Sequence, residues 1–207
     1  MLSKLPNFAN NVLVMDSTVI TIRRNALAPL LKDPSEEVRL AAAHALESLE
    51  GLGSLDEILA ILKKGSIAAK IRAIYALGKI GGEKVLPPLI YCIARPEEDI
   101  KSAAIEVLGN LAHPATLAPL IGKLQDPNPT IKAKTIAALA NFRDPSLAKL
   151  LLPFLDENDG LLDAEAALAL GRVGDCRLEE HLIRLLHSPH AKTREAAAMA
   201  LGQLPFS

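Results

Sequence analysis

The chain has few of the residues that build β-sheets, metal sites or disulfide frameworks. Of its 207 residues none is tryptophan, only 3% are aromatic, and two are cysteines. A β-sandwich needs far more β-branched and aromatic residues than this. Cys92 and Cys176 have neither the spacing of metal ligands nor that of a disulfide framework, and two free thiols suit a reducing cytosol.

Neither positive nor negative charge is in excess, and the sequence has no long apolar run. Lys and Arg together number 23 and Asp and Glu 24, so the formal net charge is −1. Nucleic-acid binding relies on a basic excess that neutralises phosphates, which argues against such a partner. No apolar run reaches the ~18 residues of a membrane span, and the N-terminus lacks the pattern of a signal peptide. We therefore expect a cytoplasmic protein without a nucleic-acid or membrane partner.

Catalytic signatures are also missing. The sequence contains no P-loop, no GxGxxG motif and no GxSxG motif. His181, His187 and His190 surround the last predicted turn, but they lack cysteines or carboxylates at a matching spacing, so we interpret them as surface histidines. The sequence thus predicts no catalytic residue, no cofactor and no metal, and we expect that the protein is not an enzyme.

What the sequence does contain is a regular internal repeat, which is clearest in a column of six leucines. We number each repeat position by its residue in the first repeat, so the column is position 46: Leu46, Leu77, Leu108, Leu139, Leu170 and Leu201. Positions 38, 42, 45 and 49 are nearly always apolar too, and they share one face of a helix with position 46. We therefore expect these positions to form a continuous core.

A second apolar column lies upstream in each repeat, at positions 27 and 31, and predicts another helix. Pro, Gly, Asp, Asn or Ser separates the two helices in most repeats, as in Asp33-Pro34-Ser35 and Asp126-Pro127-Asn128. Gly51, Gly81 and Gly174 suit left-handed ends for the second helix. Each repeat is thus predicted to be a helical hairpin.

Stacked hairpins of this kind predict an all-α fold, a right-handed α-α superhelix or ARM/HEAT-like α-solenoid of six 31-residue hairpins. We expect residues 23–207 to form one domain and residues 1–22 an N-terminal cap or arm. No cap is evident after the sixth repeat. A homo-oligomer that forms through this uncapped C-terminal repeat therefore stays an open alternative.

Four stretches resemble HEAT repeats of the phycobilisome-lyase (PBS lyase) subtype. They are VRLAAAHAL (38–46), IRAIYALGKIG (71–81), AEAALALGRVGD (164–175) and REAAAMALG (194–202). The resemblance implies a polar ladder between repeats, made by an Asp in the turn and a basic residue six positions later, as in Asp33/Arg39 and Asp126/Lys132. It also implies an alternative function, that of a phycobilin-lyase-like or chaperone-like subunit binding a tetrapyrrole or its carrier protein.

The face of the second helix opposite the core carries positions 37, 40, 41, 44 and 48, and in this fold it lines the concave surface. Leu40, Ile71 and Tyr75 are unusual choices for positions that face solvent. We predict a partner-binding patch, called here the predicted patch: Leu40, His44, Ile71, Arg72, Tyr75 and Lys79. The alternative is that the N-terminal arm folds over these residues. The predicted function is a non-enzymatic protein–protein interaction scaffold that binds another protein.

Overall fold

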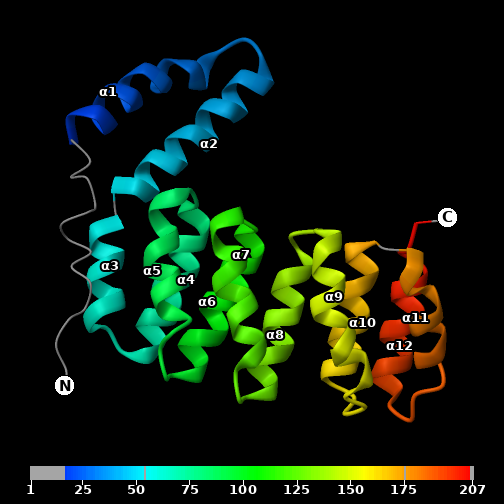
Figure 1. The fold of residues 1–207 in the computed structure, drawn as a ribbon. Coiled ribbons are helices and arrows are strands. Elements are labelled where there is room, and N and C mark those ends of the chain that lie inside the picture. Colours follow the sequence, from blue (N-terminus) through cyan, green and yellow to red (C-terminus); the bar gives the residue numbers. More distant parts are fainter. Residues whose placement is uncertain (1–16, 54, 175, 206–207) are drawn as a thin grey trace. The chain divides into compact units, whose positions relative to one another are not determined.

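The computed structural model describes residues 17–53, 55–174 and 176–205, and in these ranges every regular element is helical (Figure 1). Repeats 1 and 2 comprise α1 (Ser17–Leu27), η1 (Ala28–Lys32), α2 (Glu36–Gly53), α3 (Leu55–Lys64) and α4 (Ile67–Ile80). Repeats 3 and 4 comprise η2 (Glu83–Val85), α5 (Leu86–Cys92), α6 (Glu98–Leu111), α7 (Pro114–Ile121), η3 (Gly122–Gln125) and α8 (Pro129–Ala140). Repeats 5 and 6 comprise η4 (Pro145–Leu147), α9 (Ala148–Leu151), η5 (Leu152–Asp156), α10 (Leu162–Val173), η6 (Cys176–Leu178), α11 (Glu179–Leu185) and α12 (Ala191–Leu201).

Each repeat is the predicted hairpin, and its two helices differ in regularity. The second helix, which we call the B helix, is continuous in all six repeats: α2, α4, α6, α8, α10 and α12. The first helix is short and in most repeats joins a 3-10 segment. Prolines explain part of this difference, because Pro119 lies inside α7 and Pro153 lies in η5, where each removes a backbone donor. The regular B helices therefore carry the repeat geometry.

The chain divides into two compact units between Val85 and Leu86. We call the residues up to Val85 unit 1 and those from Leu86 unit 2. The sequence predicts one domain over residues 23–207 and an N-terminal cap or arm over residues 1–22. Residues 17–22 form the start of α1, and residues 1–16 lie outside the described residues.

Unit 2 contains the most regular stack, because its B helices α6, α8, α10 and α12 pack side by side in chain order. The position 46 leucines Leu108, Leu139 and Leu170 have no exposed surface. Position 42 is buried in every repeat of the chain: Ala42, Ala73, Ala104, Thr135, Ala166 and Ala197. The core that the repeat period predicts is thus confirmed at these positions.

Neighbouring B helices in unit 2 approach each other closely through glycine. A Cβ atom added at Gly109 would lie 2.5 Å from Cβ of Ala138, and one added at Gly171 would lie 2.6 Å from Cα of Ala200. Both glycines occupy position 47, and both alanines occupy position 45 of the following repeat. We call this glycine–alanine pair the stacking contact. The repeat period alone does not predict this contact.

Unit 1 is less tightly stacked at its first repeat. Helix α2 packs against α1 and η1, whereas its contact with α4 is small. At position 43, which lies between B helices in the stack, Ala43 is exposed, while Ile74 of the next repeat has no exposed surface. The short side chain of Ala43 leaves less surface for α2 to bury, and Leu30 and Leu31 of η1 are exposed as well. Repeat 1 therefore carries an unusual amount of uncovered apolar surface.

The helix ends follow the sequence in most places. The side chains of Ser66 and Asn128 accept hydrogen bonds from backbone N–H groups at the start of α4 and α8, as predicted for capping residues. Gly81 and Gly174 end α4 and α10 with φ of 66° and 76°. The prediction for Gly51 is wrong, because α2 continues to Gly53.

Two repeats end their B helices without glycine. Ala112 has φ of 45° and Arg143 has φ of 50°, both in the left-handed region. They occupy the same repeat position as Gly81 and Gly174. The backbone therefore takes the same turn after α6 as after α10, although the side chain changes.

No helix in the described ranges is both long and apolar enough to cross a membrane.

Candidate functional site

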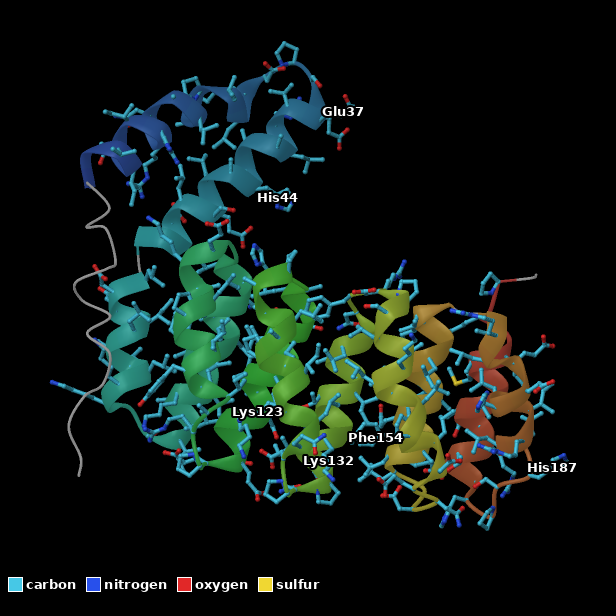
Figure 2. The ribbon with its side chains drawn as sticks, viewed as in Figure 1. Glu37, His44, Lys123, Lys132, Phe154 and His187 are labelled. Atoms are coloured by element: carbon cyan, nitrogen blue, oxygen red, sulfur yellow. The ribbon has the colours of Figure 1, made fainter. Side chains whose placement is uncertain are left out.

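The six residues of the predicted patch lie on two helices of unit 1. Leu40 and His44 are one turn apart on α2, where Leu40 is 55% exposed and His44 projects outward from the helix (Figure 2). On α4, Ile71, Tyr75 and Lys79 follow one another at intervals of four, so they share one face.

On α4, Tyr75 and Lys79 are exposed and Ile71 is half-buried. Arg72 is exposed beside them. The six residues thus lie on two helices of the same unit, α2 and α4. These two helices contact each other at few residues. The alternative was that the N-terminal arm, residues 1–22, covers them, and residues 1–16 of that arm lie outside the described residues.

The exposed large apolar side chains on B helices occur at only a few repeat positions. Among the described residues they are Leu40, Ile67, Tyr75 and Met199. These residues occupy repeat positions 36, 40 and 44, which are spaced by four and therefore lie along one face of the helix. We call this face the B-helix stripe. It contains Leu40, Ile71 and Tyr75 of the predicted patch and recurs in repeat 6.

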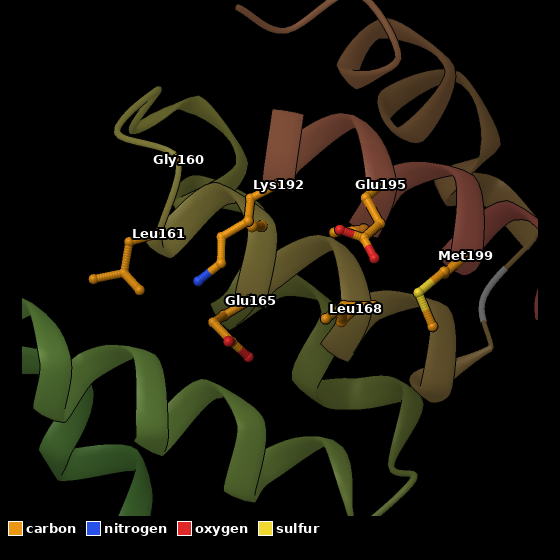
Figure 3. Close-up of a pocket in the computed structure, with 9 residues that line it drawn as sticks. Gly160, Leu161, Glu165, Leu168, Lys192, Glu195 and Met199 are labelled. Carbon is orange, nitrogen blue, oxygen red and sulfur yellow. The ribbon is translucent and has the colours of Figure 1, made fainter. Parts of the chain in front are cut away.

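In unit 2 a groove lies along the B-helix stripe between α10 and α12. The groove has a volume of about 140 Å³. Figure 3 shows Lys192, Glu195 and Met199 of α12 on one side, and Glu165 and Leu168 of α10 with the preceding Leu161 on the other. Its lining residues are Gly160, Leu161, Ala164, Glu165, Leu168, Lys192, Glu195, Ala196 and Met199.

The groove combines an apolar surface with charged groups around it. Leu168 is half-buried and Met199 is 52% exposed, while Lys192 and Glu195 are exposed and Glu165 is half-buried. All lining residues occupy positions 36, 37, 40, 41 and 44. Four of these positions belong to the face that the sequence predicts to bind a partner, but the predicted patch lies in repeats 1 and 2 and does not include this groove.

A buried ion pair joins repeats 3 and 4 beside the stack. Nζ of Lys101 on α6 lies 2.7 Å from Oδ2 of Asp126 in the next turn, and the two side chains are only 13% and 5% exposed. Oδ1 of Asp126 accepts a hydrogen bond from the backbone N–H of Asn128 at 3.1 Å. Burial acts to raise the pKa of Asp126, but the hydrogen bonds from Lys101 and Asn128, with the nearby positive charges, lower it below its ordinary value.

This ion pair predicts a stability difference that depends on pH. The contribution of Asp126 to stability should be fully present above the ordinary pKa of 3.8 and lost as the pH falls through the lowered pKa of the folded state. We expect Asp126→Asn to be about 1–3 kcal/mol less stable than the wild type at neutral pH. The difference should shrink below pH ~4. Urea denaturation at a series of pH values measures it, and a difference that stays constant down to acid pH would contradict the assignment.

The polar ladder implied by the resemblance forms differently from the expectation. Nη1 of Arg39 donates to the backbone carbonyl oxygens of Asp33 and Pro34, at 2.8 and 3.0 Å, and not to the Asp33 carboxylate. Arg194 makes the same two contacts with Ser188 and Pro189. Arg39 and Arg194 therefore hold the turn of their own repeat, whereas Lys101 pairs with the carboxylate of the next repeat.

The histidines around the last turn do not gather. His181 and His187 are exposed, and a ring nitrogen of His190 lies 3.1 Å from the backbone oxygen of Asn158. In the part of the chain that the structure describes, no group of three or more His, Cys, Asp or Glu side chains is placed to hold a metal ion.

Comparison with known proteins agrees with this geometry. The family model for HEAT repeats matches residues 24–100, 86–164 and 149–205. An engineered protein with a crystal structure from the Northeast Structural Genomics Consortium is similar in fold, with a TM-score of 0.53 and 19% identity, over 87% of this chain and 95% of that one. A designed armadillo repeat protein has a TM-score of 0.52 and 19% identity, over 87% of this chain and 99% of that one. Among curated proteins, none matches.

The helical hairpins, their buried ladder and these likenesses confirm the all-α, ARM/HEAT-like solenoid fold class. The matched segments together span most of the chain, and the chain belongs to the HEAT repeat family.

Proposed function

We propose that this HEAT-repeat protein is a non-enzymatic interaction scaffold of the cytosol, and that its B-helix stripe binds a segment of another protein. The observation that carries the proposal is the placement of exposed apolar side chains. On the described B helices Leu40, Ile67, Tyr75 and Met199 all fall on this one face. Solvent-facing apolar residues gathered on one face mark interaction surfaces.

The groove between α10 and α12 has the chemistry of a protein-binding pocket. Leu168 and Met199 offer apolar contact, and Lys192, Glu165 and Glu195 can fix the direction of a bound segment through charge. Its volume of about 140 Å³ suits a side chain of a partner. Small-molecule sites are usually larger, roughly 300–1,000 Å³.

In repeats 1 and 2 the same stripe contains residues of the predicted patch. Tyr75 is an aromatic residue with Ile71 on one side along α4 and the cations Arg72 and Lys79 nearby. Tyr residues with a polar rim are frequent anchors of binding energy. We therefore propose that the predicted patch is a second surface for a protein segment, in addition to the groove.

The alternative function is that of a phycobilin-lyase-like or chaperone-like subunit. Its support is the resemblance of stretches such as IRAIYALGKIG to the PBS lyase subtype of HEAT repeats. The groove does not favour a tetrapyrrole, since its volume is below that of usual small-molecule sites. Mixing the purified protein with a bilin and recording the absorption spectrum separates the two functions, because only a tetrapyrrole-binding protein would shift it.

Affinity capture with variants of the stripe tests the scaffold proposal. We expect Tyr75→Ala and Met199→Ala each to lose a partner that the wild type captures, while the melting temperature changes by less than about 2 °C. Capture followed by mass spectrometry identifies the partner, and titration calorimetry with that purified partner then measures the affinity of each variant.

Leu150→Ala is the matched control. Leu150 lies on α9, outside the B helices, and is 42% exposed against 40% for Tyr75, so it removes a similar apolar surface elsewhere. The control should capture the partner like the wild type. Undiminished capture by both stripe variants would refute the proposal. A large loss of thermal stability in Tyr75→Ala would instead indicate that Tyr75 is covered within the chain.

A further inference from the structure

Repeats 3 and 5 make the stacking contact, and among the described residues the equivalent glycine of repeat 6 has no such neighbour. Gly109 and Gly171 each receive an alanine of the next B helix within 2.7 Å of an added Cβ atom. Gly202 holds the same position 47 after α12, yet an added Cβ would meet nothing closer than a backbone oxygen at 3.5 Å. Gly109 and Gly171 thus each face an alanine of the next B helix, whereas Gly202 faces none among the described residues.

The surroundings of Gly202 are open in the same way. At position 43, Ala198 is exposed, whereas Ile105, Ile136 and Ala167 have no exposed surface. On the preceding helix, Ile183 is 45% exposed, while its equivalents in repeats 3 to 5 are half-buried. We call Ile183, Arg194, Ala198 and Gly202 the terminal face. Its shape is that of a surface on which a further hairpin of the same kind stacks.

The first hairpin of this chain has the matching residue for that contact. Position 45 fills the glycine in each stacking contact, and the residue there in repeat 1 is Ala45. Ala45 is only half-buried, whereas Ala138, Ala169 and Ala200 are buried. A second copy could therefore place Ala45 against Gly202 just as Ala200 lies against Gly171.

Charge complementarity favours the same pairing. Between repeats 3 and 4, the cation at position 39 pairs with the carboxylate at position 33 of the next repeat, Lys101 with Asp126. Repeat 6 carries Arg194 at position 39, and repeat 1 carries Asp33 at position 33. The guanidinium of Arg194 has five N–H donors, so the contacts of its Nη1 with two carbonyl oxygens leave others to reach a carboxylate.

Asp33 and Asp126 also have the same local conformation, so their carboxylates project from the turn in the same way. The backbone angles are nearly equal, with φ −60° and ψ 144° at Asp33 and φ −62° and ψ 136° at Asp126. In both, Oδ1 accepts a hydrogen bond from the N–H two residues later. Among the described residues no cation forms an ion pair with Asp33, whereas Asp126 has Lys101.

From these observations we propose that the protein associates with itself head to tail: the terminal face of one copy receives the first hairpin of a second copy, with Gly202 against Ala45 and Arg194 against Asp33. This interface lies outside the B-helix stripe, so it goes beyond the proposed function. Because the two surfaces differ, the contact is heterologous and continues from copy to copy until a ring closes or a filament grows. The mass in solution should therefore rise past that of two chains as the concentration increases.

Gly202→Leu tests the stacking contact. A side chain at Gly202 has room within its own chain, so the variant should keep the melting temperature and circular dichroism spectrum of the wild type. Its bulk would block Ala45 of the second copy. Sedimentation velocity over a concentration series should show growing assemblies for the wild type and single chains for Gly202→Leu. A wild type that stays a single chain throughout, or a Gly202→Leu variant that assembles like it, would overturn the proposal.

Charge reversal tests the orientation. Arg194→Glu and Asp33→Lys should each raise the dissociation constant at least about tenfold, and the double variant should recover most of the affinity. Arg172→Glu, an exposed change of the same charge on α10, serves as the control and should assemble like the wild type. A double variant as weak as the single ones, or a control as weak as Arg194→Glu, would overturn the pairing of Arg194 with Asp33.

Discussion

Leu108→Asp is expected to lower the free energy of unfolding of unit 2 by about 5 kcal/mol or more. Leu108 is a member of the leucine ladder, lies within α6 and has no exposed surface. The substitution removes the apolar contacts of a leucine and places a carboxylate where water does not reach. A typical domain has a total stability of about 5–15 kcal/mol, so most of unit 2 should lose its fold. Urea denaturation followed by circular dichroism measures the loss.

Asn110→Asp is the control for this prediction. Asn110 lies two residues later on the same helix and is exposed, so the same charge enters at the surface. Its free energy of unfolding should stay within about 0.5 kcal/mol of the wild type. If Leu108→Asp unfolded at the same urea concentration as Asn110→Asp, the assignment of position 46 to the core would be wrong.

Gly171→Ala is expected to destabilise the protein by about 1–3 kcal/mol, although alanine is the better helix former. The added Cβ would lie 2.6 Å from Cα and 2.7 Å from Cβ of Ala200. These are backbone or backbone-fixed atoms, so no flexible side chain can move aside, and α10 and α12 would have to separate. Thermal and urea denaturation of the purified variant give the size of the effect.

Gly202→Ala should act in the opposite direction. The repeat position is the same, but the nearest atom to an added Cβ is the Met199 carbonyl oxygen at 3.5 Å, an ordinary contact. Gly202 has φ of −70°, which alanine adopts without strain, so the variant should be as stable as the wild type or more stable by up to about 1 kcal/mol. Equal effects of the two substitutions would show that the stacking contact does not limit how closely the helices approach.

Most of the fold can be predicted from the sequence because the repeat period fixes which positions share a helix face. Six leucines at position 46 and small residues at position 42 indicate the core side of every B helix, and the structure buries position 42 in all six repeats. Glycine and capping residues add the helix ends, with the exception of Gly51. These predictions succeed because they depend only on periodicity within one helix.

The contacts between helices are harder to predict because the period says nothing about distance or about the facing residue. Gly109 at position 47 meets Ala138 at position 45, and Lys101 at position 39 meets Asp126 at position 33. Each pair joins two different repeat positions, so a comparison of equivalent positions does not reveal it. The loose packing of the first repeat is equally hard to predict. Ala43 and Ile74 are both apolar residues at position 43 and differ only in size.

The candidate site shows the same limit. The binding face was predictable as a set of positions, because residues opposite the core must face solvent or a partner. Which repeats form a groove was not, since that depends on how the side chains of Leu161, Glu165 and Lys192 fill the space between α10 and α12. The sequence directed attention to Tyr75, whereas Met199 at the same repeat position lines the groove.

The left-handed residues Ala112 and Arg143 have a consequence for how much the repeats can diverge. Each adopts a backbone conformation that disfavours a side chain by about 1–2 kcal/mol, at a joint where other repeats use glycine. The joint keeps its angle because the packed helices on both sides dictate it. Substitutions at such joints should therefore accumulate without altering the path of the chain, so long as the interior ladder is maintained.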